Sequence, residues 1–282
     1  MEIFEKLASY FEFPFVRYAL IVTVAISICA AMVGVTIVLR RLSNIGDGLS
    51  HVAFGALAIG IIINITDKFY IVLPITFLAA FLLLKTKNSK KLKGDSAIAM
   101  ISVSALALAY FFLNVFDTSS NLAGDVCSTL FGSTAILTLS KTDVLISVIL
   151  SLVTVALYTI FYNKIFVTTF DENFARASGM KVAIYDVFIA LSIASIVVIS
   201  INLVGSLLVT ALLIFPALSA MRLAKSYKMT IIISIILSIV CSVIGVLSSM
   251  LMSTPTGPTI VIFYLGVFLV CFAIGKIKER MA

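Results

Sequence analysis

The sequence predicts an all-α, polytopic membrane protein of about nine transmembrane helices, and three observations lead to that prediction. First, 62% of the 282 residues are hydrophobic and only 12% are charged. Second, the mean hydropathy is +1.22, which is more apolar than a soluble domain can bury. Third, apolar runs alternate with short basic segments. In a bilayer, the backbone N–H and C=O groups of such runs need hydrogen-bond partners within the protein, and an α-helix supplies them. We therefore expect residues 1–282 to form a single transmembrane domain.

The predicted spans are apolar runs that approach the roughly 20 residues needed to cross the hydrocarbon core. Pro14 suits the start of the first helix, where its missing N–H costs no hydrogen bond. Asn202 alone divides the sixth span from the seventh, which predicts a tight helical hairpin, and Pro216 predicts a kink in the seventh. The predicted spans are 15–39, 43–65, 69–84, 96–116, 142–162, 187–201, 203–221, 230–252 and 259–275.

Two segments depart from this pattern of spans and short connections. Residues 117–141 are of mixed polarity and predict an external loop that contains a short half-helix. Residues 163–186 form the most polar internal segment, in which Phe170 to Met180 has an amphipathic helical pattern. Gly179 is placed as a glycine that ends a helix.

Charge placement predicts the orientation in the cell membrane. With the N-terminus outside and the C-terminus in the cytoplasm, 16 of the 20 basic residues face the cytoplasm, as the positive-inside rule requires. The basic isoelectric point of about 9.2 is therefore explained by topology, and we expect no nucleic-acid partner. The four cysteines are scattered and contain no CxxC pair, so they predict neither a disulfide framework nor a zinc finger.

One aspartate and the only histidine of the chain stand out within this apolar sequence. Asp47 and His51 are four residues apart, so on a helix they share a face, and both are ligands for a divalent cation. An ionisable residue inside a membrane is a functional-site hypothesis by default. The alternative is that Asp47 caps a helix and His51 lies at the interface. A helix from His51 to Ile65 is too short to cross the bilayer, which favours the ligand interpretation.

The number of ligands predicts the assembly. One chain offers one Asp and one His, whereas a closed tetrahedral site takes four ligands, so two copies across a two-fold axis would complete it. We therefore expect a homodimer that binds a transported metal and holds no permanent cofactor. The small residues Gly46, Ser50 and Gly55 suit close helix approach, either at this site or in ordinary helix packing.

Several stretches, in order along most of the chain, resemble the membrane subunits of bacterial zinc/manganese/iron ABC importers. These stretches are Arg40–Ala56, Leu130–Gly132, Phe170–Gly179, Val204–Ala220 and Thr254–Pro258. The chain departs from that family's pattern at Ser133, where many relatives have Asp, and at Asn173-Phe174, which replaces a more acidic, aliphatic pair.

The resemblance implies a permease that works by alternating access, with an external solute-binding protein and cytoplasmic ATPases as partners. Asp47 and His51 match positions that touch the metal during passage. The segment that docks on the ATPase matches Phe170–Met180, with Phe174 or Met180 as an apolar plug. Asp171, Glu172 and Arg176 would form a polar rim around this apolar contact. Phe170 and Gly179 belong to the same ATPase-coupling segment.

Other classes fit the sequence less well. The chain has no GxxxxGK[ST], so it does not bind ATP through a P-loop and is not expected to be an enzyme. A single histidine rules out an HExxH metalloprotease. Ser50 and His51 point apart on a helix, which argues against a Ser/His nucleophile. A secondary, ion-coupled metal transporter is the remaining alternative.

The Thr254–Pro258 turn favours zinc as the transported metal, with manganese or iron as the other candidates.

Overall fold

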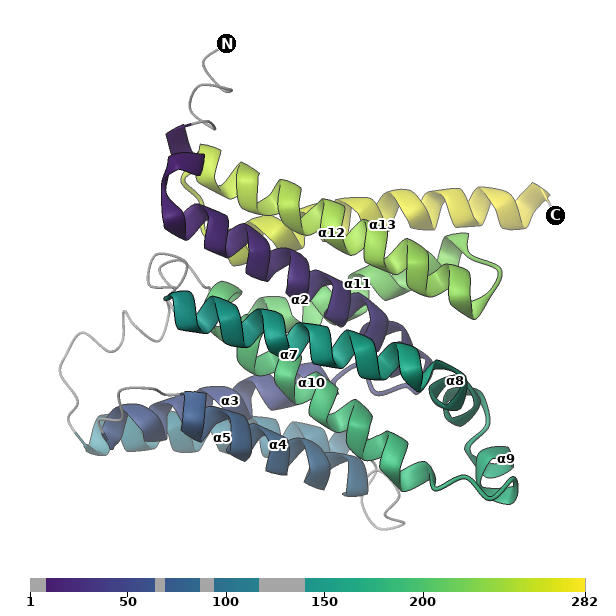
Figure 1. Cartoon of the computed structure of the whole chain (residues 1–282), viewed down its shortest axis with the longest axis horizontal. Helices are drawn as coiled ribbons and strands as arrows, with labels where there is room; N and C mark the ends of the chain where they lie inside the picture. The colour runs from purple at the N-terminus through teal and green to yellow at the C-terminus, as the bar shows by residue number, and fades with distance from the viewer. Residues whose placement is uncertain (1–8, 64–68, 87–93, 117–139, 282) are drawn as a thin grey trace.

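The computed structural model describes residues 9–63, 69–86, 94–116 and 140–281, and this part of the chain is helical, with no strand. The all-α prediction is confirmed, and the long helices lie side by side in one bundle (Figure 1). The helices are α2 (Pro14–Leu39), α3 (Ile45–Ile62), α4 (Phe69–Thr86), α5 (Gly94–Val115), α7 (Lys141–Ile160), α8 (Tyr162–Phe170), α9 (Glu172–Ala177), α10 (Val182–Val204), α11 (Ser206–Leu223), α12 (Tyr227–Met252) and α13 (Thr256–Met281).

Seven of the described helices are long and apolar enough to cross a membrane, namely α2, α3, α5, α7, α10, α12 and α13. The apolar parts of α4 and α11 are shorter, covering Phe69–Leu83 and Leu208–Leu223. The bundle therefore matches the predicted class, but the count of nine spans stays a prediction. Pro14 occupies the first turn of α2, as its fixed φ angle favours.

Three boundaries differ from the sequence prediction. The break between α10 and α11 falls at Gly205, and Asn202 lies within α10. Gly205 has a φ of 81°, a conformation that glycine adopts without a steric penalty, which explains why the helix breaks there. The polar segment forms two short helices, α8 and α9, where one amphipathic helix was expected. The predicted external segment 117–141 lies outside the described residues, apart from its last two positions, as does Ser133.

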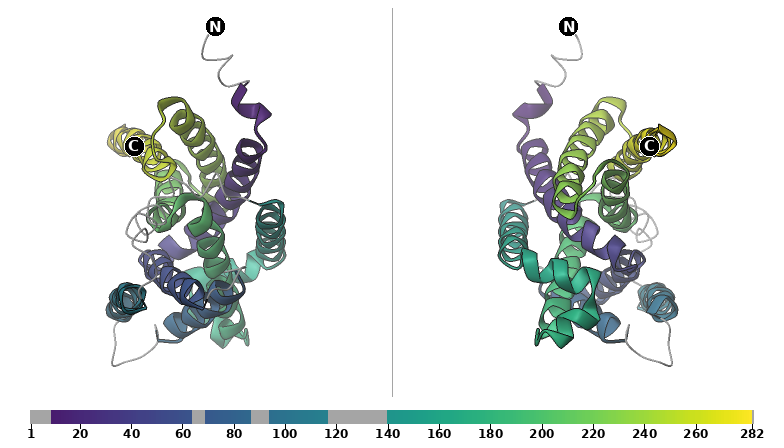
Figure 2. Two further views of the ribbon diagram at one scale, coloured as in Figure 1. Left: turned by 90° about the vertical axis from the view of Figure 1, so that its left-hand side faces the viewer. Right: turned by 90° about the vertical axis from the view of Figure 1, so that its right-hand side faces the viewer.

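The bundle has two sides joined by a central helix. α2, α11, α12 and α13 pack together on one side, and α3, α4 and α5 pack on the other. The end-on views show this division, with α13 and the α4–α5 pair far apart (Figure 2). Between them, α10 contacts α2 and α11 as well as α3 and α4.

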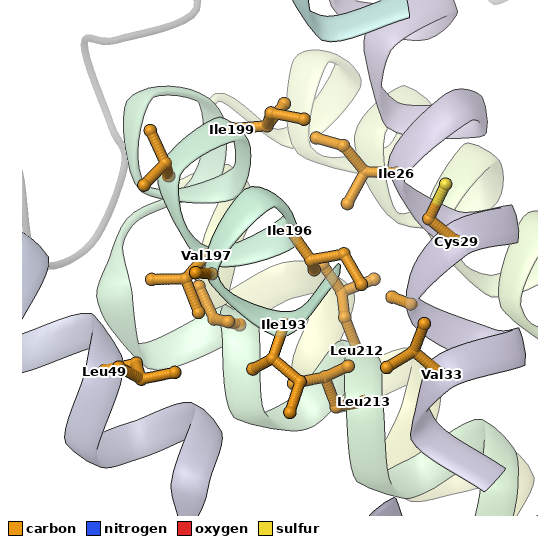
Figure 3. Packing of buried hydrophobic residues seen from close by; sticks show 14 of the residues in the cluster. Ile26, Cys29, Val33, Leu49, Ile193, Ile196, Val197, Ile199, Leu212 and Leu213 are labelled. Carbon is orange, nitrogen blue, oxygen red and sulfur yellow. The ribbon is translucent and has the colours of Figure 1, made fainter. Parts of the chain in front are cut away.

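The apolar core lies where these central helices meet. Ile26, Cys29 and Val33 of α2 face a row of α10 side chains, and residues of α3 and α11 close the cluster (Figure 3). The α10 and neighbouring members labelled there are Ile193, Ile196, Val197, Ile199, Leu49, Leu212 and Leu213.

A glycine sets the closest helix approach in this core. Gly34 of α2 lies directly against the backbone of α11, and a Cβ atom at this position would overlap the Leu213 carbonyl oxygen. Small residues allow such contacts in membrane helices, where dispersion forces and close packing hold neighbours together. The contact fixes α2 on the α11 side of the core.

Candidate metal path and coupling segment

Asp47 and His51 lie one turn apart near the start of α3. The helix begins at Ile45, so Asp47 is already inside its first turn and does not occupy the cap position. Asn44 occupies that position, and its side chain makes no capping hydrogen bond. The capping alternative for Asp47 is therefore wrong. His51 Nε2 lies 3.6 Å from Asp47 Oδ1, so the acid and the imidazole meet on one face of the helix.

The described residues cover α3 on every side except for one stripe. Between Ile45 and Gly60, only Asp47, His51, Gly55 and Ile59 are not buried. A spacing of four residues places them in one line along the helix. The side chain of Asp47 is 48% exposed and that of His51 is 19% exposed. Both ionisable groups therefore belong to the face of α3 that the described residues leave partly open.

One ring nitrogen of the histidine has no hydrogen-bond partner in the described part of the chain. Its Nδ1 atom is buried and has no hydrogen-bond partner among the described residues. An unpaired buried polar atom costs about 1–3 kcal/mol and requires an explanation, of which a bound ion is one. No group of three or more His, Cys, Asp or Glu side chains in the described part of the chain is placed to hold a metal ion. Within that part, one copy brings together two candidate ligands.

The glycines beside this pair serve contacts within one chain. A Cβ atom at Gly46 would lie 2.9 Å from Leu213 Cδ1 of α11. At Gly55 a Cβ atom would lie 3.3 Å from the Ala105 carbonyl oxygen of α5. Both contacts are tighter than ordinary van der Waals packing, so ordinary helix packing explains these two glycines.

The predicted coupling segment forms α8, α9 and the turns around them. Asp171 caps α9 by accepting a hydrogen bond from the Phe174 N–H at 2.9 Å, and Arg176 pairs with Glu172 one turn away at 2.6 Å. Gly179 follows the end of α9 with a φ of 80°, which confirms the predicted helix stop. The Met180 N–H then donates to the Ala175 carbonyl, which closes the turn.

This segment presents apolar side chains at one end of the molecule. Phe174 is 60% exposed, and Phe170 is similarly exposed. α9 projects beyond the neighbouring helices at the end of the bundle that also holds the end of α13 (Figure 1). The structure therefore brings Phe170, Asp171, Glu172, Phe174, Arg176, Gly179 and Met180 together on one projection.

The sequence interpretation missed a buried cation beside this projection. The sequence indicates no partner for Arg40 beyond its place at the end of the first span, yet its side chain is only 3% exposed and pairs with Asp186. The two residues are 146 positions apart, so no local motif connects them. Arg40 also donates to the hydroxyl groups of Thr168 and Thr169.

A bundle of apolar, membrane-spanning helices that also carries ionisable groups is typical of a membrane transport protein. The chain belongs to the ABC 3 transport family, whose family model matches residues 12–275. The resemblance seen in the sequence is confirmed: the chain is a permease subunit of the metal ABC importer class.

Named relatives carry two different metals in their descriptions. The manganese import system permease protein ScaB of Streptococcus gordonii is 32% identical over 271 residues, covering 95% of this chain and 94% of that protein. The high-affinity zinc uptake system membrane protein ZnuB of Buchnera aphidicola is 30% identical over 239 residues, covering 85% and 89%. The solved structure of PsaBC from Streptococcus pneumoniae in complex with Fab matches with a TM-score of 0.82 and 31% identity, covering 96% of this chain and 94% of that chain.

Proposed function

We propose that this permease carries a divalent transition metal across the membrane along a path lined by Asp47 and His51. The observation that supports this proposal is the open stripe of α3. Between Ile45 and Gly60, Asp47 and His51 are among the few residues of α3 that are not buried. A carboxylate and a neutral imidazole both bind Zn²⁺, Mn²⁺ and Fe²⁺. An apolar helix that faced only lipid would have no use for either group.

The ligand count supports a homodimer in which two α3 helices face each other. Two copies would contribute two carboxylates and two imidazoles, enough for a four-ligand site on the two-fold axis. A bound metal would also give the unpaired His51 imidazole a partner. The metal is cargo here, so the site must release it as well as bind it.

ATP-driven transport by alternating access is the mechanism that suits this class. The chain has no P-loop, so separate cytoplasmic ATPase subunits would supply the energy, and an external solute-binding protein would deliver the ion. We assign α9 and its flanking residues as the ATPase contact, since Phe174 exposes an apolar ring outside the bundle. In the proposed orientation, α9 and the C-terminus lie in the cytoplasm and the N-terminus lies outside.

The metal itself is best assigned by experiment, because relatives named for manganese and for zinc both match, at 32% and 30% identity. The permease would be reconstituted with its ATPase in proteoliposomes, and ATP hydrolysis would be measured with Zn²⁺ or Mn²⁺ delivered by the binding protein. The cognate metal is expected to stimulate hydrolysis. Transport without ATP, driven by an ion gradient, would instead support the secondary-transporter alternative.

Replacing either ligand tests the metal path directly. We expect Asp47→Ala and His51→Ala to abolish metal uptake in these proteoliposomes, because each change removes two ligands from a symmetric site. Asn114→Ala on α5 is the control, since that exposed side chain donates to the carbonyl of Tyr110 on its own helix. Near-normal uptake by a folded, assembled His51→Ala protein would refute the metal path.

Cross-linking tests the assigned coupling segment. A cysteine in place of Phe174 should form a cross-link to the ATPase in membranes, because its side chain projects from the end of the bundle. A cysteine in place of Lys141, at the opposite end of α7 from α8, should not. If the two positions react equally, α9 is not the contact.

A further inference from the structure

Arg40, which directly follows α2, forms hydrogen bonds to the helices on both sides of α9. Arg40 Nη1 donates to Asp186 Oδ1, Nη2 donates to Thr168 Oγ1 at 2.8 Å, and Nε lies 3.4 Å from Thr169 Oγ1. The two threonines belong to α8, which precedes α9, and Asp186 belongs to α10, which follows it. One side chain therefore bridges the two elements between which α9 projects.

Arg40 is buried, unlike basic residues that only set the orientation of a protein in the membrane. A basic residue that only sets orientation sits in water or at the lipid headgroups. Arg41, the next residue, is exposed and can meet that need. Arg40 is 3% exposed and Asp186 is 24% exposed, so the pair is largely withdrawn from solvent. The planar guanidinium suits three acceptors in different directions, which a lysine cannot satisfy with the same geometry.

On its other side, Arg40 is tied to the helix that carries the candidate ligands. Arg41 has a φ of 58°, and the turn is closed by hydrogen bonds from Arg41 N–H to the Val38 carbonyl and from Leu42 N–H to the Ile37 carbonyl. Leu42 then accepts from the Ile45 N–H at 3.0 Å, and α3 begins at that residue. Because Leu42 and Ile45 are buried, this connection is a short packed turn with little slack.

Movement of α8 and the start of α10 must therefore carry Arg40 with it or break its three hydrogen bonds. Breaking them would strand a buried charge, which is far costlier than disturbing an exposed ion pair. The Glu172–Arg176 pair, by contrast, lies within α9 and moves with that helix. A displacement carried by Arg40 passes through the packed turn to the first turn of α3, where Asp47 lies.

We propose that Arg40, held by Asp186 and Thr168, is a positioning residue that transmits displacement of the coupling segment to the metal-ligand helix α3. The inference rests on the proposed function, because it presumes that α9 meets the ATPase and that α3 carries the ligands. It adds the physical link between them: a guanidinium that holds α8 and α10, continuous with a tight turn into α3.

The test separates transmission from simple stabilisation with a double-mutant cycle. Arg40→Gln, Asp186→Asn and the double variant would be reconstituted with the ATPase. Thermal stability, cross-linking of Phe174→Cys to the ATPase, metal-stimulated ATP hydrolysis and metal uptake would be measured for each. Lys164→Gln is the matched control: it removes an exposed basic charge from the same helix, α8, and the contact of Lys164 with α10 is at the outer limit of a cation–π interaction, 6.0 Å from the centre of the Tyr185 ring.

Each single variant should retain the cross-link while metal-stimulated hydrolysis and uptake fall by about tenfold or more, the scale of losing one charged hydrogen bond. The double variant, which leaves no stranded charge, should regain thermal stability without regaining coupling. Lys164→Gln should behave as the parent protein. Recovery of uptake together with stability in the double variant would overturn the proposal, because the pair would then be merely structural.

The same experiment distinguishes failure of the proposed function. If the parent complex shows no metal uptake, or if Phe174→Cys fails to cross-link in the parent, the metal path or the coupling assignment is wrong. If the parent transports and cross-links while Arg40→Gln transports at the parent rate, the proposed function stands and the role of Arg40 is refuted.

Discussion

At the scale of single residues, buried polar groups in this bundle fall into two kinds. Thr36, Tyr158 and Tyr227 come from α2, α7 and α12, and their three hydroxyl groups lie within hydrogen-bond distance of one another, at 2.6–3.1 Å. Such a cluster satisfies its own members and rigidifies the packing. His51 differs, because its buried Nδ1 has no partner among the described residues. Ser151 Oγ and Ser200 Oγ are likewise buried without a partner among the described residues, so our assignment of His51 to transport depends also on its imidazole chemistry and its position beside Asp47.

Gly34 gives a prediction at this scale. Gly34→Ala should strongly destabilise the protein, because the added methyl group would overlap the backbone carbonyl of Leu213, which cannot rotate away. Overpacking of a core costs about 1–3 kcal/mol, and a clash with backbone belongs at the upper end. The check is the thermal midpoint of the protein purified in detergent.

Gly266→Ala on α13 is the matched control for that measurement. No atom lies within 4 Å of a Cβ atom placed there. The change should be neutral or slightly stabilising, because alanine favours a helix over glycine by about 1 kcal/mol. Equal midpoints for the Gly34 and Gly266 variants would show that the α2–α11 contact has room for a methyl group.

At the scale of elements, α9 is a single short helix whose shape depends on its two ends. A helix of six residues is not stable alone, so the Asp171 cap, the Glu172–Arg176 pair and the turn at Gly179 together define it. The aromatic residues of α8 anchor its base, where the Phe170 and Phe166 rings pack on Tyr227. The projection is thus shaped locally and fixed to the bundle at one side.

Substitutions at Gly179 test this account of α9. Its φ of 80° favours glycine, tolerates asparagine and disfavours β-branched residues, while a Cβ atom would meet no neighbour within 4 Å. Gly179→Val should therefore reduce metal-stimulated ATP hydrolysis, and Gly179→Asn should preserve most of it. The ATPase assay would contradict the account if both variants lost activity alike, since side-chain bulk would then matter more than backbone conformation.

The positions of most helices could be predicted from the sequence, because runs of apolar residues and basic ends mark them directly. α2, with Pro14 at its start and two arginines after it, is the clearest case. The break at Gly205 was misplaced because Asn202 is the more polar residue, whereas backbone conformation decides where a helix ends. The count of spans was uncertain for the same kind of reason, since the apolar parts of α4 and α11 are short.

Some residues of the candidate site could be predicted from the sequence, whereas others are brought together only by the fold. Asp47 and His51 could be found from the sequence because their relation is local, one turn of one helix. The Arg40–Asp186 pair could not, because it joins residues 146 positions apart that only the fold brings together. The open stripe along α3 was equally invisible, since it depends on which faces α4, α5, α10 and α11 cover.

At the scale of the whole molecule, the burial of the helices is unequal. α2, α3 and α10 hide most of their surface within the chain, whereas α5, α7 and α13 expose most of theirs. Exposed apolar helices suit contact with lipid or with a second copy. The stripe of α3 is an exception among the central helices because it exposes ionisable groups. A second copy that covered this stripe would complete the proposed metal path.

A tandem dimer tests whether the path is shared. Two copies are joined in one polypeptide through an added membrane-spanning linker helix, because the proposed termini lie on opposite sides of the membrane. With Asp47→Ala/His51→Ala in one half only, this tandem should lose most metal uptake, because a shared site would keep two of its four ligands. The parent tandem and the tandem with both halves altered provide the upper and lower limits. Uptake at half the parent rate or better would show that each copy has its own path.

The hydrogen bond between Ser27 of α2 and Ser242 of α12 has a consequence for how the protein is made. The two hydroxyl groups lie 2.8 Å apart, but 215 residues of chain separate them. At about 5–20 residues per second, a ribosome needs roughly 10–40 s to supply the second serine after the first. During that interval α2 is already in the bilayer, where a lone serine hydroxyl can turn back to a carbonyl of its own helix. The native bond, and with it the final packing of α2 against α12, therefore waits until nearly all of the chain has been synthesised.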